Sequence, residues 1–278
     1  MDKTQAYKCL GKEDPLLDLI KRTNKYLLDL RLAKWITQKQ YELLSIKPNE
    51  GYLPKAHKPG TPLRPIISGL THPTIKISKF LDNLLRPLFD KIAQKITVNS
   101  GFELLKKLKE WSELNINQET LFCTIDVVDL YTMIPQVEGV LSLKKMLDYL
   151  NLKQINGLKL ETIIRLSRFV MQNNYFSYDG QFYHQIRGGA MGSPLTLTVT
   201  NCYMFFFEQQ IIKQIKNSGG LYFRYIDDIF ITINWPVRHL LKQIERWNKF
   251  DENIKLNANI GSSTNFLDLY IENQDGIL

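Results

Sequence analysis

Residues 222–233 read YFRYIDDIFITI, and this stretch largely decides what fold the rest of the chain should form. The aromatic and β-branched residues on both sides of Asp227 and Asp228 predict two strands of a hairpin, with the two carboxylates at its tip. Two adjacent anions among apolar side chains are costly unless they form an exposed turn or face a counter-charge. A divalent cation is the natural counter-charge for clustered carboxylates, so this stretch leaves both an ordinary turn and a metal site open.

A third carboxylate follows a second strand-like run. Residues 121–128 read LFCTIDVV, and Asp126 lies where this apolar run ends. If this strand pairs beside the hairpin, three carboxylates converge. Such a cluster can hold two Mg²⁺ ions about 4 Å apart, with Mn²⁺ as an alternative, and that arrangement serves phosphoryl transfer.

The remaining pattern predicts an α+β protein, in which a run of helices precedes and surrounds the strands. Ser193 and Pro194 predict a helix start, with a hydroxyl cap and a proline at the first helical position. We expect helices within 14–46 and at 75–93, 137–150, 158–173, 194–217 and 237–250, hairpins at 175–186 and 222–233, a hairpin or loop at 52–68, and a last strand pair at 255–260 and 266–271.

Composition limits the class of protein. A chain of 278 residues with 44% hydrophobic residues can form one large domain or two modest ones. No apolar run approaches the roughly 18 residues of a membrane span, and no signal peptide is evident, so we expect an intracellular protein that does not contact membranes. The net charge of +8 comes entirely from residues 1–120. A basic half suits a lobe that grips a polyanion, although a solubilising surface explains the charge equally well.

Three motifs resemble those of reverse transcriptases and follow one another along the chain in that family's order. Tyr225-Ile226-Asp227-Asp228 resembles the Tyr-x-Asp-Asp signature, residues 126–131 resemble the earlier catalytic strand, and residues 188–194 resemble the loop and helix start between them. More narrowly, the chain resembles Penelope-like retroelement reverse transcriptases at residues 53–58, 63–68, 130–135, 190–195 and 265–269.

The resemblance implies a right-hand polymerase fold of the α+β class, whose antiparallel palm sheet is backed by helices in a ferredoxin-like or RRM-like arrangement. Residues 1–50 would form a helical lead-in, residues 51–120 the fingers and residues 121–278 the palm, with the fingers continuing in part through 136–190. The implied activity is RNA-directed DNA polymerase, a nucleotidyltransferase. Its partners would be an RNA template, a DNA primer and deoxynucleoside triphosphates, and its location would be nuclear.

The resemblance also implies roles for the acidic residues. Asp126 and Asp227 would bind metal, Asp228 would be a third ligand or an electrostatic support, and the carbonyl of Val127 would add another ligand. The secondary candidates near these residues are Asp129, Leu130 and Tyr225.

Other residues would hold the incoming nucleotide. Lys58 and Arg64 would bind the triphosphate, with Lys55 as the competing choice and nonspecific phosphate contact as the alternative. Tyr131 would be a steric gate that collides with a 2′-hydroxyl and selects deoxynucleotides, unless it is a plain core tyrosine.

The glycine-rich loop shows departures from the family pattern. Gly192, with Ser193 as a secondary candidate, would let backbone approach the nucleotide or templating base, unless this is an ordinary loop before a helix. Many reverse transcriptases have Gln where this chain has Gly188, so a side-chain contact to the nucleotide would be missing. Met133 stands where the Penelope-like pattern usually has Asn.

The chain ends at Leu278, where the family's thumb is expected to follow, so we expect a fragment with weak retention of duplexes.

Two competing hypotheses remain. The chain could be a catalytically idle relic that binds RNA or RNA–DNA, which the presence of all three aspartates disfavours. It could also be an RNA-dependent RNA polymerase with the same palm, which the bulky Tyr131 disfavours.

Overall fold

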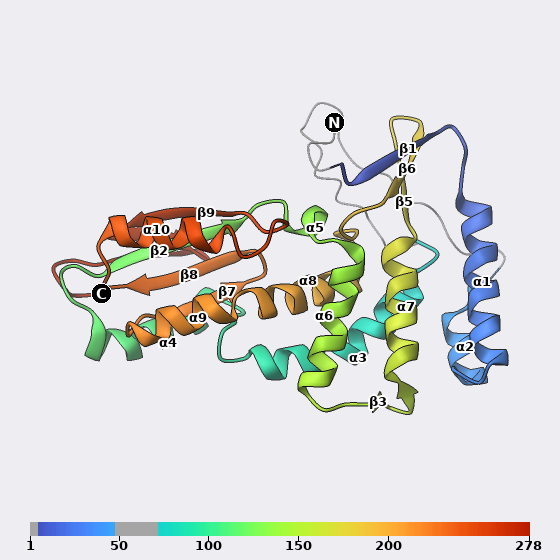
Figure 1. Cartoon of the computed structure of the whole chain (residues 1–278), viewed down its shortest axis with the longest axis horizontal. Coiled ribbons are helices and arrows are strands. Elements are labelled where there is room, and N and C mark those ends of the chain that lie inside the picture. Colours follow the sequence, from blue (N-terminus) through green and yellow to red (C-terminus); the bar gives the residue numbers. More distant parts are fainter. Residues whose placement is uncertain (1–4, 48–71) are drawn as a thin grey trace. The chain divides into compact units, whose positions relative to one another are not determined.

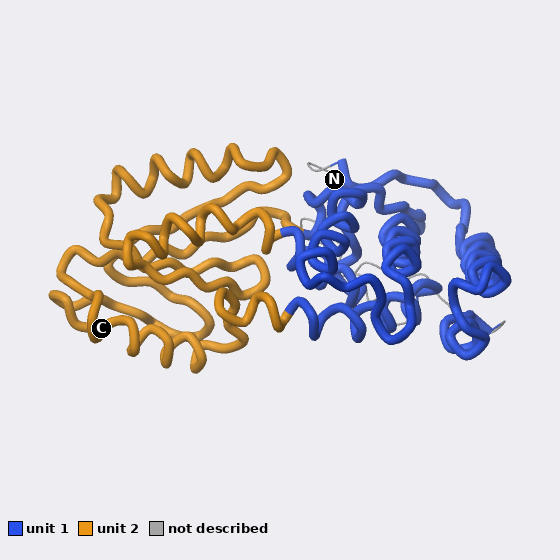
Figure 2. The backbone as a smooth tube through the Cα atoms, turned by 60° about the horizontal axis from the view of Figure 1, so that its bottom comes forward, with its two compact units in different colours: residues 1–89, 131–203 blue, residues 90–130, 204–278 orange. Residues whose placement is uncertain are grey.

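The computed structural model describes residues 5–47 and 72–278 of the chain. It divides into two compact units, each made of two separate stretches of sequence (Figure 2). Unit 1 comprises residues 1–89 and 131–203, and unit 2 comprises residues 90–130 and 204–278. The predicted hairpin or loop at 52–68, with Lys55, Lys58 and Arg64, lies outside the described residues. The assignment of fingers and palm by residue range stays a prediction.

Unit 2 is built on a four-stranded antiparallel sheet (Figure 1). The strands lie in the order β7 (Tyr222–Tyr225), β8 (Asp228–Ile233), β2 (Leu121–Val127) and β9 (Leu256–Gly261). The predicted hairpin at 222–233 is confirmed, and so is the predicted pairing of the Asp126 strand beside it. Because β2 is paired on both sides, the end of the strand that carries Asp126 is held by two ladders.

Side chains on this sheet alternate between its two faces, as strand geometry requires. Phe122 and Phe230 point to one face and stack with ring centroids 6.0 Å apart. That face packs against α4 (Gly101–Asn115) and the hairpin of β10 (Ser263–Phe266) and β11 (Leu269–Glu272). The buried core of this face consists of Val98, Leu104, Leu108, Trp111, Phe122, Phe223, Phe230, Phe266 and Ile271.

The opposite face of the sheet is covered by α9 (Gln209–Asn217) and α10 (Val237–Trp247). Trp247 is fully buried and donates its ring N–H to Gln214 of α9 at 2.8 Å, which joins the two helices. Leu240 and Ile244 are the other buried residues of α10. The predicted helix at 237–250 is therefore confirmed, with an end three residues earlier than its sequence pattern indicated.

The predicted pairing of 255–260 with 266–271 is wrong. Instead β9 pairs with β2, with Asn257 opposite Asp126 and Asn259 opposite Thr124. The hairpin β10–β11 then forms locally through Leu267 and Asp268, which both have positive φ. Period-two alternation identifies a strand but carries no information about its partner.

The predicted helix at 194–217 is two helices, α8 (Pro194–Phe207) and α9, separated at Glu208. Backbone hydrogen bonds continue across the junction, from Glu208 N to Met204 O and from Ile212 N to Glu208 O, both at 2.9 Å. Helical hydrogen bonds therefore span the junction. The carboxylate of Glu208 lies in a buried cluster with Tyr222 and Arg224.

Unit 1 combines helices with a three-stranded antiparallel sheet in the order β1-β6-β5. The predicted hairpin is confirmed as β5 (Asn174–Tyr178) and β6 (Gln181–Gln185), joined by Asp179 and Gly180 with positive φ, as a type I′ loop requires. The strand β1 (Tyr7–Gly11), which the sequence analysis missed, pairs with β6. The other elements, some of which continue past the unit boundary, are α1 (Leu16–Leu32), α2 (Gln38–Leu44), α3 (Ile75–Ala93), α5 (Leu130–Met133), α6 (Gln136–Tyr149), β3 (Gln154–Ile155), β4 (Leu158–Lys159) and α7 (Leu160–Gln172).

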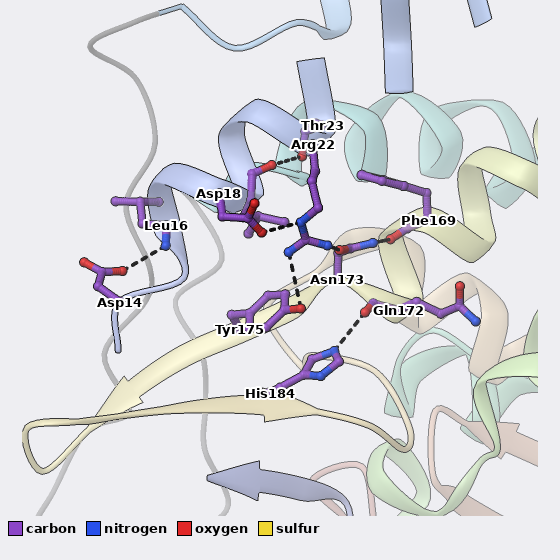
Figure 3. Close-up of polar contacts among 11 residues, drawn as sticks. Asp14, Leu16, Asp18, Arg22, Thr23, Phe169, Gln172, Asn173, Tyr175 and His184 are labelled. Carbon is purple, nitrogen blue, oxygen red and sulfur yellow. Dashed lines mark hydrogen bonds and ion pairs between the residues drawn. The ribbon is translucent and has the colours of Figure 1, made fainter. Parts of the chain in front are cut away.

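Arg22 fastens α1 to the end of α7 (Figure 3). Its guanidinium donates to Asp18 at 2.6 Å, to the side-chain oxygen of Asn173 at 2.8 Å and to the hydroxyl of Tyr175 at 3.4 Å. The Tyr175 ring stacks on His184, with centroids 4.3 Å apart. At least one basic residue of the N-terminal helices therefore serves packing within the unit.

In the described part of the chain, every helix is too short or too polar to cross a membrane.

Candidate active site

Asp126 and Asp228 are the centre of the candidate site. They lie directly opposite each other in neighbouring antiparallel strands, so their Cβ atoms are separated by about 4.5–5.5 Å. Asp126 and Asp228 are separated from Phe122 and Phe230 by even numbers of residues along their strands, so all four side chains point to the same face of the sheet. Beyond the aromatic core this face opens into a pocket of about 320 Å³, and both aspartates line it.

The electrostatics of the pair favour a bound cation. Partial burial raises the pKa of Asp228, and the negative charges of Asp227 and Asp126 raise it further. Asp126 and Asp228 are both exposed, and the negative charges at the site repel one another. A carboxylate whose pKa is raised by its neighbours gains from a nearby cation, which removes the repulsion.

Asp227 lies in the two-residue turn between β7 and β8, half-buried, with Ile226 before it. Ile226 has a φ of +56°, which is unfavourable for a β-branched residue and costs about 1–3 kcal/mol. The carbonyl of Asp227 accepts a hydrogen bond of 3.0 Å from the backbone N–H of Val127. The turn is therefore joined to the strand that carries Asp126 by this backbone bond.

The structure brings together two of the three predicted carboxylates in one pocket, and it places the third in the adjacent turn. Across residues 5–47 and 72–278, the structure contains no ready-made group of three His, Cys, Asp or Glu side chains that could hold a metal ion. Asp126 and Asp228 nevertheless fit Mg²⁺, which is commonly bound through one or two carboxylates while waters and substrate phosphates complete its shell. The side chain of Val127 is buried. The backbone N–H of Val127 donates the hydrogen bond to the turn at Asp227.

Neutral amides line the pocket beside the carboxylates. Asn257 and Asn259 of β9 lie opposite Asp126 and Thr124, and Asn265 of β10 also contributes to the lining. Amide side chains offer both donors and acceptors and carry no charge that repels phosphate. This wall of the pocket is suited to a polar, anionic ligand, a property the sequence analysis did not anticipate.

Unit 1 brings together Tyr131 and the glycine-rich loop. Tyr131 is half-buried in α5, and its carbonyl accepts a 2.9 Å hydrogen bond from the N–H of Gly189. Gly188 has a φ of +67°, and a Cβ there would lie 2.0 Å from the Tyr131 carbonyl oxygen. The departure at Gly188 therefore has a local cause, because a larger residue would strain the backbone and collide with α5.

The other predicted residues of unit 1 lie around this loop. Gly192 is half-exposed in the turn before α8, and Met133 accepts a hydrogen bond from Arg187 through its carbonyl. Ser193 is buried and its hydroxyl bonds to that of Ser78 at 2.7 Å. The predicted capping role of Ser193 passes to Ser78, whose hydroxyl accepts from the N–H of Leu195 at 3.0 Å.

Three secondary candidates lie in unit 2. Asp129 is exposed with a φ of +50°, in the turn that follows β2, whereas Leu130 is buried. Tyr225 lies opposite Asp228 in the hairpin and packs against the aromatic core. Tyr225 and Leu130 therefore have packing roles, and Asp129 remains exposed near the end of β2.

The sequence analysis missed a buried polar cluster behind the hairpin. Arg224 and Glu208 form an ion pair of 2.8 Å, and both side chains are 0% exposed. Tyr222 donates its hydroxyl to Glu208 at 2.6 Å, and burial beside that carboxylate raises the pKa of Tyr222 well above its ordinary value. The available signal was one charged residue within each of two apolar runs, YFRY and MFFFEQQII.

Comparison with known proteins gives structural matches only. No protein-family model matches the chain, and the search of curated proteins found no match. Apo telomerase from Candida tropicalis, truncated from its C-terminal domain, aligns with a TM-score of 0.56 at 14% identity, over 70% of this chain and 43% of that one. Telomerase from Candida albicans, in complex with the TWJ fragment of telomeric RNA, aligns with a TM-score of 0.54 at 14% identity, over 72% and 38%.

A viral enzyme is similar as well. The BmCPV RNA-dependent RNA polymerase at elongation state aligns with a TM-score of 0.55 at 12% identity, over 90% of this chain and 23% of that one. The chain thus spans less than half the length of each of these three structures. The chain therefore has a polymerase-like fold.

Proposed function

We propose that this chain is the fingers-and-palm part of an RNA-directed DNA polymerase of the Penelope-like retroelement kind. The observation that carries the proposal is the placement of Asp126 directly opposite Asp228, where both line one pocket, in a chain with a polymerase-like fold. The likeness to telomerase, including one structure in complex with a fragment of telomeric RNA, supports RNA as a partner.

The carboxylates would hold Mg²⁺, with Mn²⁺ as a substitute. Mg²⁺ held there would supply positive charge to activate the 3′-hydroxyl of a primer and to offset the charge on the pyrophosphate that leaves. Asp126 and Asp228 would supply ligands from the sheet, and Asp227 would add negative charge, or a ligand, from the turn. The pairing of β2 with both β8 and β9 would keep these groups in place between reaction cycles, since strands hold a site more rigidly than loops.

The remaining residues would bind substrates. Asn257, Asn259 and Asn265 would hydrogen bond with a nucleic-acid strand beside the carboxylates. Tyr131 would exclude ribonucleotides. Lys58 and Arg64, with Lys55 as the competing residue, would bind the triphosphate by charge.

Primer extension tests the proposal. A DNA primer annealed to an RNA template is mixed with the protein, Mg²⁺ and deoxynucleoside triphosphates, and the single-turnover rate is measured. Asp126→Asn should lower the rate by about 10²–10³-fold, because a metal ligand supplies several kcal/mol of transition-state stabilisation. Asp148→Asn, at an exposed position on α6, is the matched control and should leave the rate unchanged. A wild-type protein that binds the duplex but extends it with neither Mg²⁺ nor Mn²⁺ would contradict the proposal and support an idle relic.

RNA synthesis is the second candidate, because the BmCPV RNA polymerase aligns with 90% of this chain. The same assay with ribonucleoside triphosphates separates the two activities. Preference for ribonucleotides on an RNA template would replace the DNA polymerase proposal with this one. Preference for deoxynucleotides would support reverse transcription.

A further inference from the structure

The turn that carries Asp227 adopts a conformation that its sequence does not favour. Two-residue hairpin loops with positive φ at the first position favour Gly, Asn or Asp there, whereas this chain has Ile226 with a φ of +56°. Such a conformation persists only where the surrounding structure over-determines it. The source of that constraint should be visible in the contacts of the turn.

Two hydrogen bonds hold the peptide groups on either side of Asp227. Before it, the carbonyl of Ile226 accepts from Nη1 of Arg224 at 2.9 Å. After it, the carbonyl of Asp227 accepts from the N–H of Val127 at 3.0 Å. With both flanking peptides fixed, the backbone of Asp227 has little freedom to rotate, and the direction in which its side chain leaves the backbone is set.

The guanidinium of Arg224, which makes the first of these bonds, is itself held by two hydrogen bonds to Glu208. Its Nε donates to one oxygen of Glu208 at 2.8 Å and its Nη2 donates to the other at 3.3 Å. The backbone of Arg224 is also held, since its N–H donates to Ile96 at 2.9 Å and its carbonyl accepts from Val98 at 3.1 Å. A planar guanidinium bound in this fork has a single orientation, which a lysine cannot reproduce.

We propose that Arg224, oriented by Glu208, is a positioning residue that holds the Ile226 turn so that Asp227 is presented correctly beside Asp126 and Asp228. This rests on the proposed polymerase function for its catalytic consequence. A buried ion pair contributes little net stability compared with apolar residues of the same shape, so its main effect is expected on geometry. Arg224 contacts neither substrate nor metal in this account, and acts only through the turn.

The test compares Arg224→Lys with Tyr222→Phe. The lysine variant keeps a positive charge beside Glu208 but loses the fork that reaches the Ile226 carbonyl. The phenylalanine variant removes a hydrogen bond from the same buried carboxylate and leaves the bond from Arg224 to Ile226 in place. We expect Arg224→Lys to lower the single-turnover extension rate by about 10–100-fold, the usual range for residues that orient ligands, with little change in the apparent affinity for deoxynucleotide. Tyr222→Phe should change the rate by less than about threefold.

A double mutant separates positioning from general stability. Asn adopts positive φ more readily than Ile, so Ile226→Asn should make the turn less dependent on Arg224. In that background Arg224→Lys should cost a smaller factor than in the wild type. Equal losses in both backgrounds, or a fully active Arg224→Lys protein, would overturn the proposal. If Arg224→Lys does not fold, Glu208→Gln, which removes the charge that orients the guanidinium, takes its place with the same expected results.

Amide hydrogen exchange gives a readout that requires neither metal nor substrate. The N–H of Val127 bonds to Asp227, so its protection reports whether the turn stays docked on β2. Arg224→Lys should increase its exchange rate at least about tenfold, and Tyr222→Phe should not. Unchanged protection in Arg224→Lys would refute the positioning role even if the wild-type protein were an active polymerase. Conversely, a wild-type protein that extends no primer would refute the proposed function, and the exchange experiment would still decide this inference.

Discussion

Asp126 on β2 lies directly opposite Asp228 on β8, and both carboxylates face one pocket. Like charges directly opposite in an antiparallel pair destabilise the sheet. The arrangement therefore lowers the stability of the protein without a cation and provides ligands when a cation is present. The free energy of unfolding and the rate of primer extension should therefore respond in opposite directions when one of these charges is removed.

Replacing Asp228 by Asn should stabilise the metal-free protein. The change removes one of two opposed charges while keeping side-chain volume, and such pairs are worth about 0.2–1 kcal/mol. The free energy of unfolding, measured by urea denaturation in the presence of a chelator, should rise by that amount. The same variant should lose primer extension by at least about 10²-fold. Asp148→Asn serves as the control, and a less stable Asp228→Asn protein would contradict the repulsion described above.

The stability of the metal-free protein should depend on pH through Asp228. Its pKa in the folded protein is raised by partial burial and by Asp227 and Asp126, so the charged form is disfavoured by folding. This destabilisation is present above the folded pKa and is relieved as the pH falls through it. The stability difference between Asp228→Asn and wild type should therefore shrink as the pH is lowered from 7 towards 4. Thermal unfolding across this range measures it, and a difference that grows on acidification would give the wrong sign.

Replacing Tyr131 by Ala should weaken discrimination against ribonucleotides. If the ring blocks a 2′-hydroxyl, its removal should lower the deoxynucleotide preference by at least about tenfold, which corresponds to about 1.4 kcal/mol. Steady-state incorporation of matched ribo- and deoxynucleotides measures the ratio. Tyr149→Ala, at an exposed tyrosine of α6, is the control. An unchanged sugar preference in Tyr131→Ala would remove the gate role and leave Tyr131 as a packing residue.

Gly188→Ala should destabilise the protein more than Gly180→Ala. Both glycines have positive φ, +67° and +70°, so both substitutions meet the same backbone penalty of about 1–2 kcal/mol. A Cβ at Gly180 has open space within 4 Å, whereas one at Gly188 would lie 2.0 Å from the Tyr131 carbonyl. Urea denaturation should therefore give an additional loss of about 1–3 kcal/mol for Gly188→Ala. Equal losses would mean that α5 and the loop are not held together as described.

Much of the fold was accessible from the sequence because its strongest signals are local. The hairpins around Asp179-Gly180 and Asp227-Asp228 were predicted because turn residues or paired carboxylates interrupt clear strand patterns. The second turn lies one residue earlier than predicted, at Ile226 and Asp227, so Asp228 is the first residue of β8. The pairing of the Asp126 strand beside the second hairpin was also predicted. The helix α4 was missed, although Ser100 caps it: the hydroxyl of Ser100 accepts a hydrogen bond from the backbone N–H of Glu103.

The features that could not be predicted depend on contacts between distant segments. The partner of β9 is β2, far earlier in the chain, and nothing in the residues of β9 specifies it. The amide-lined wall of the pocket depends on that pairing. The ion pair of Arg224 with Glu208 likewise joins β7 to a residue 16 positions earlier, between α8 and α9. Asp227 lies in the turn beside the pocket, close enough for its charge to raise the pKa of Asp228, and its role as a metal ligand stays a prediction.

The most direct test of the central claim is the location of Mn²⁺ by anomalous X-ray diffraction. Crystals would contain the protein, an RNA template, a DNA primer and a deoxynucleotide analogue that cannot react. We expect an anomalous peak in contact with carboxylate oxygens of both Asp126 and Asp228, with the nucleotide phosphates completing the coordination. A bound nucleotide with Mn²⁺ located elsewhere, or with both carboxylates lacking metal contact, would contradict it.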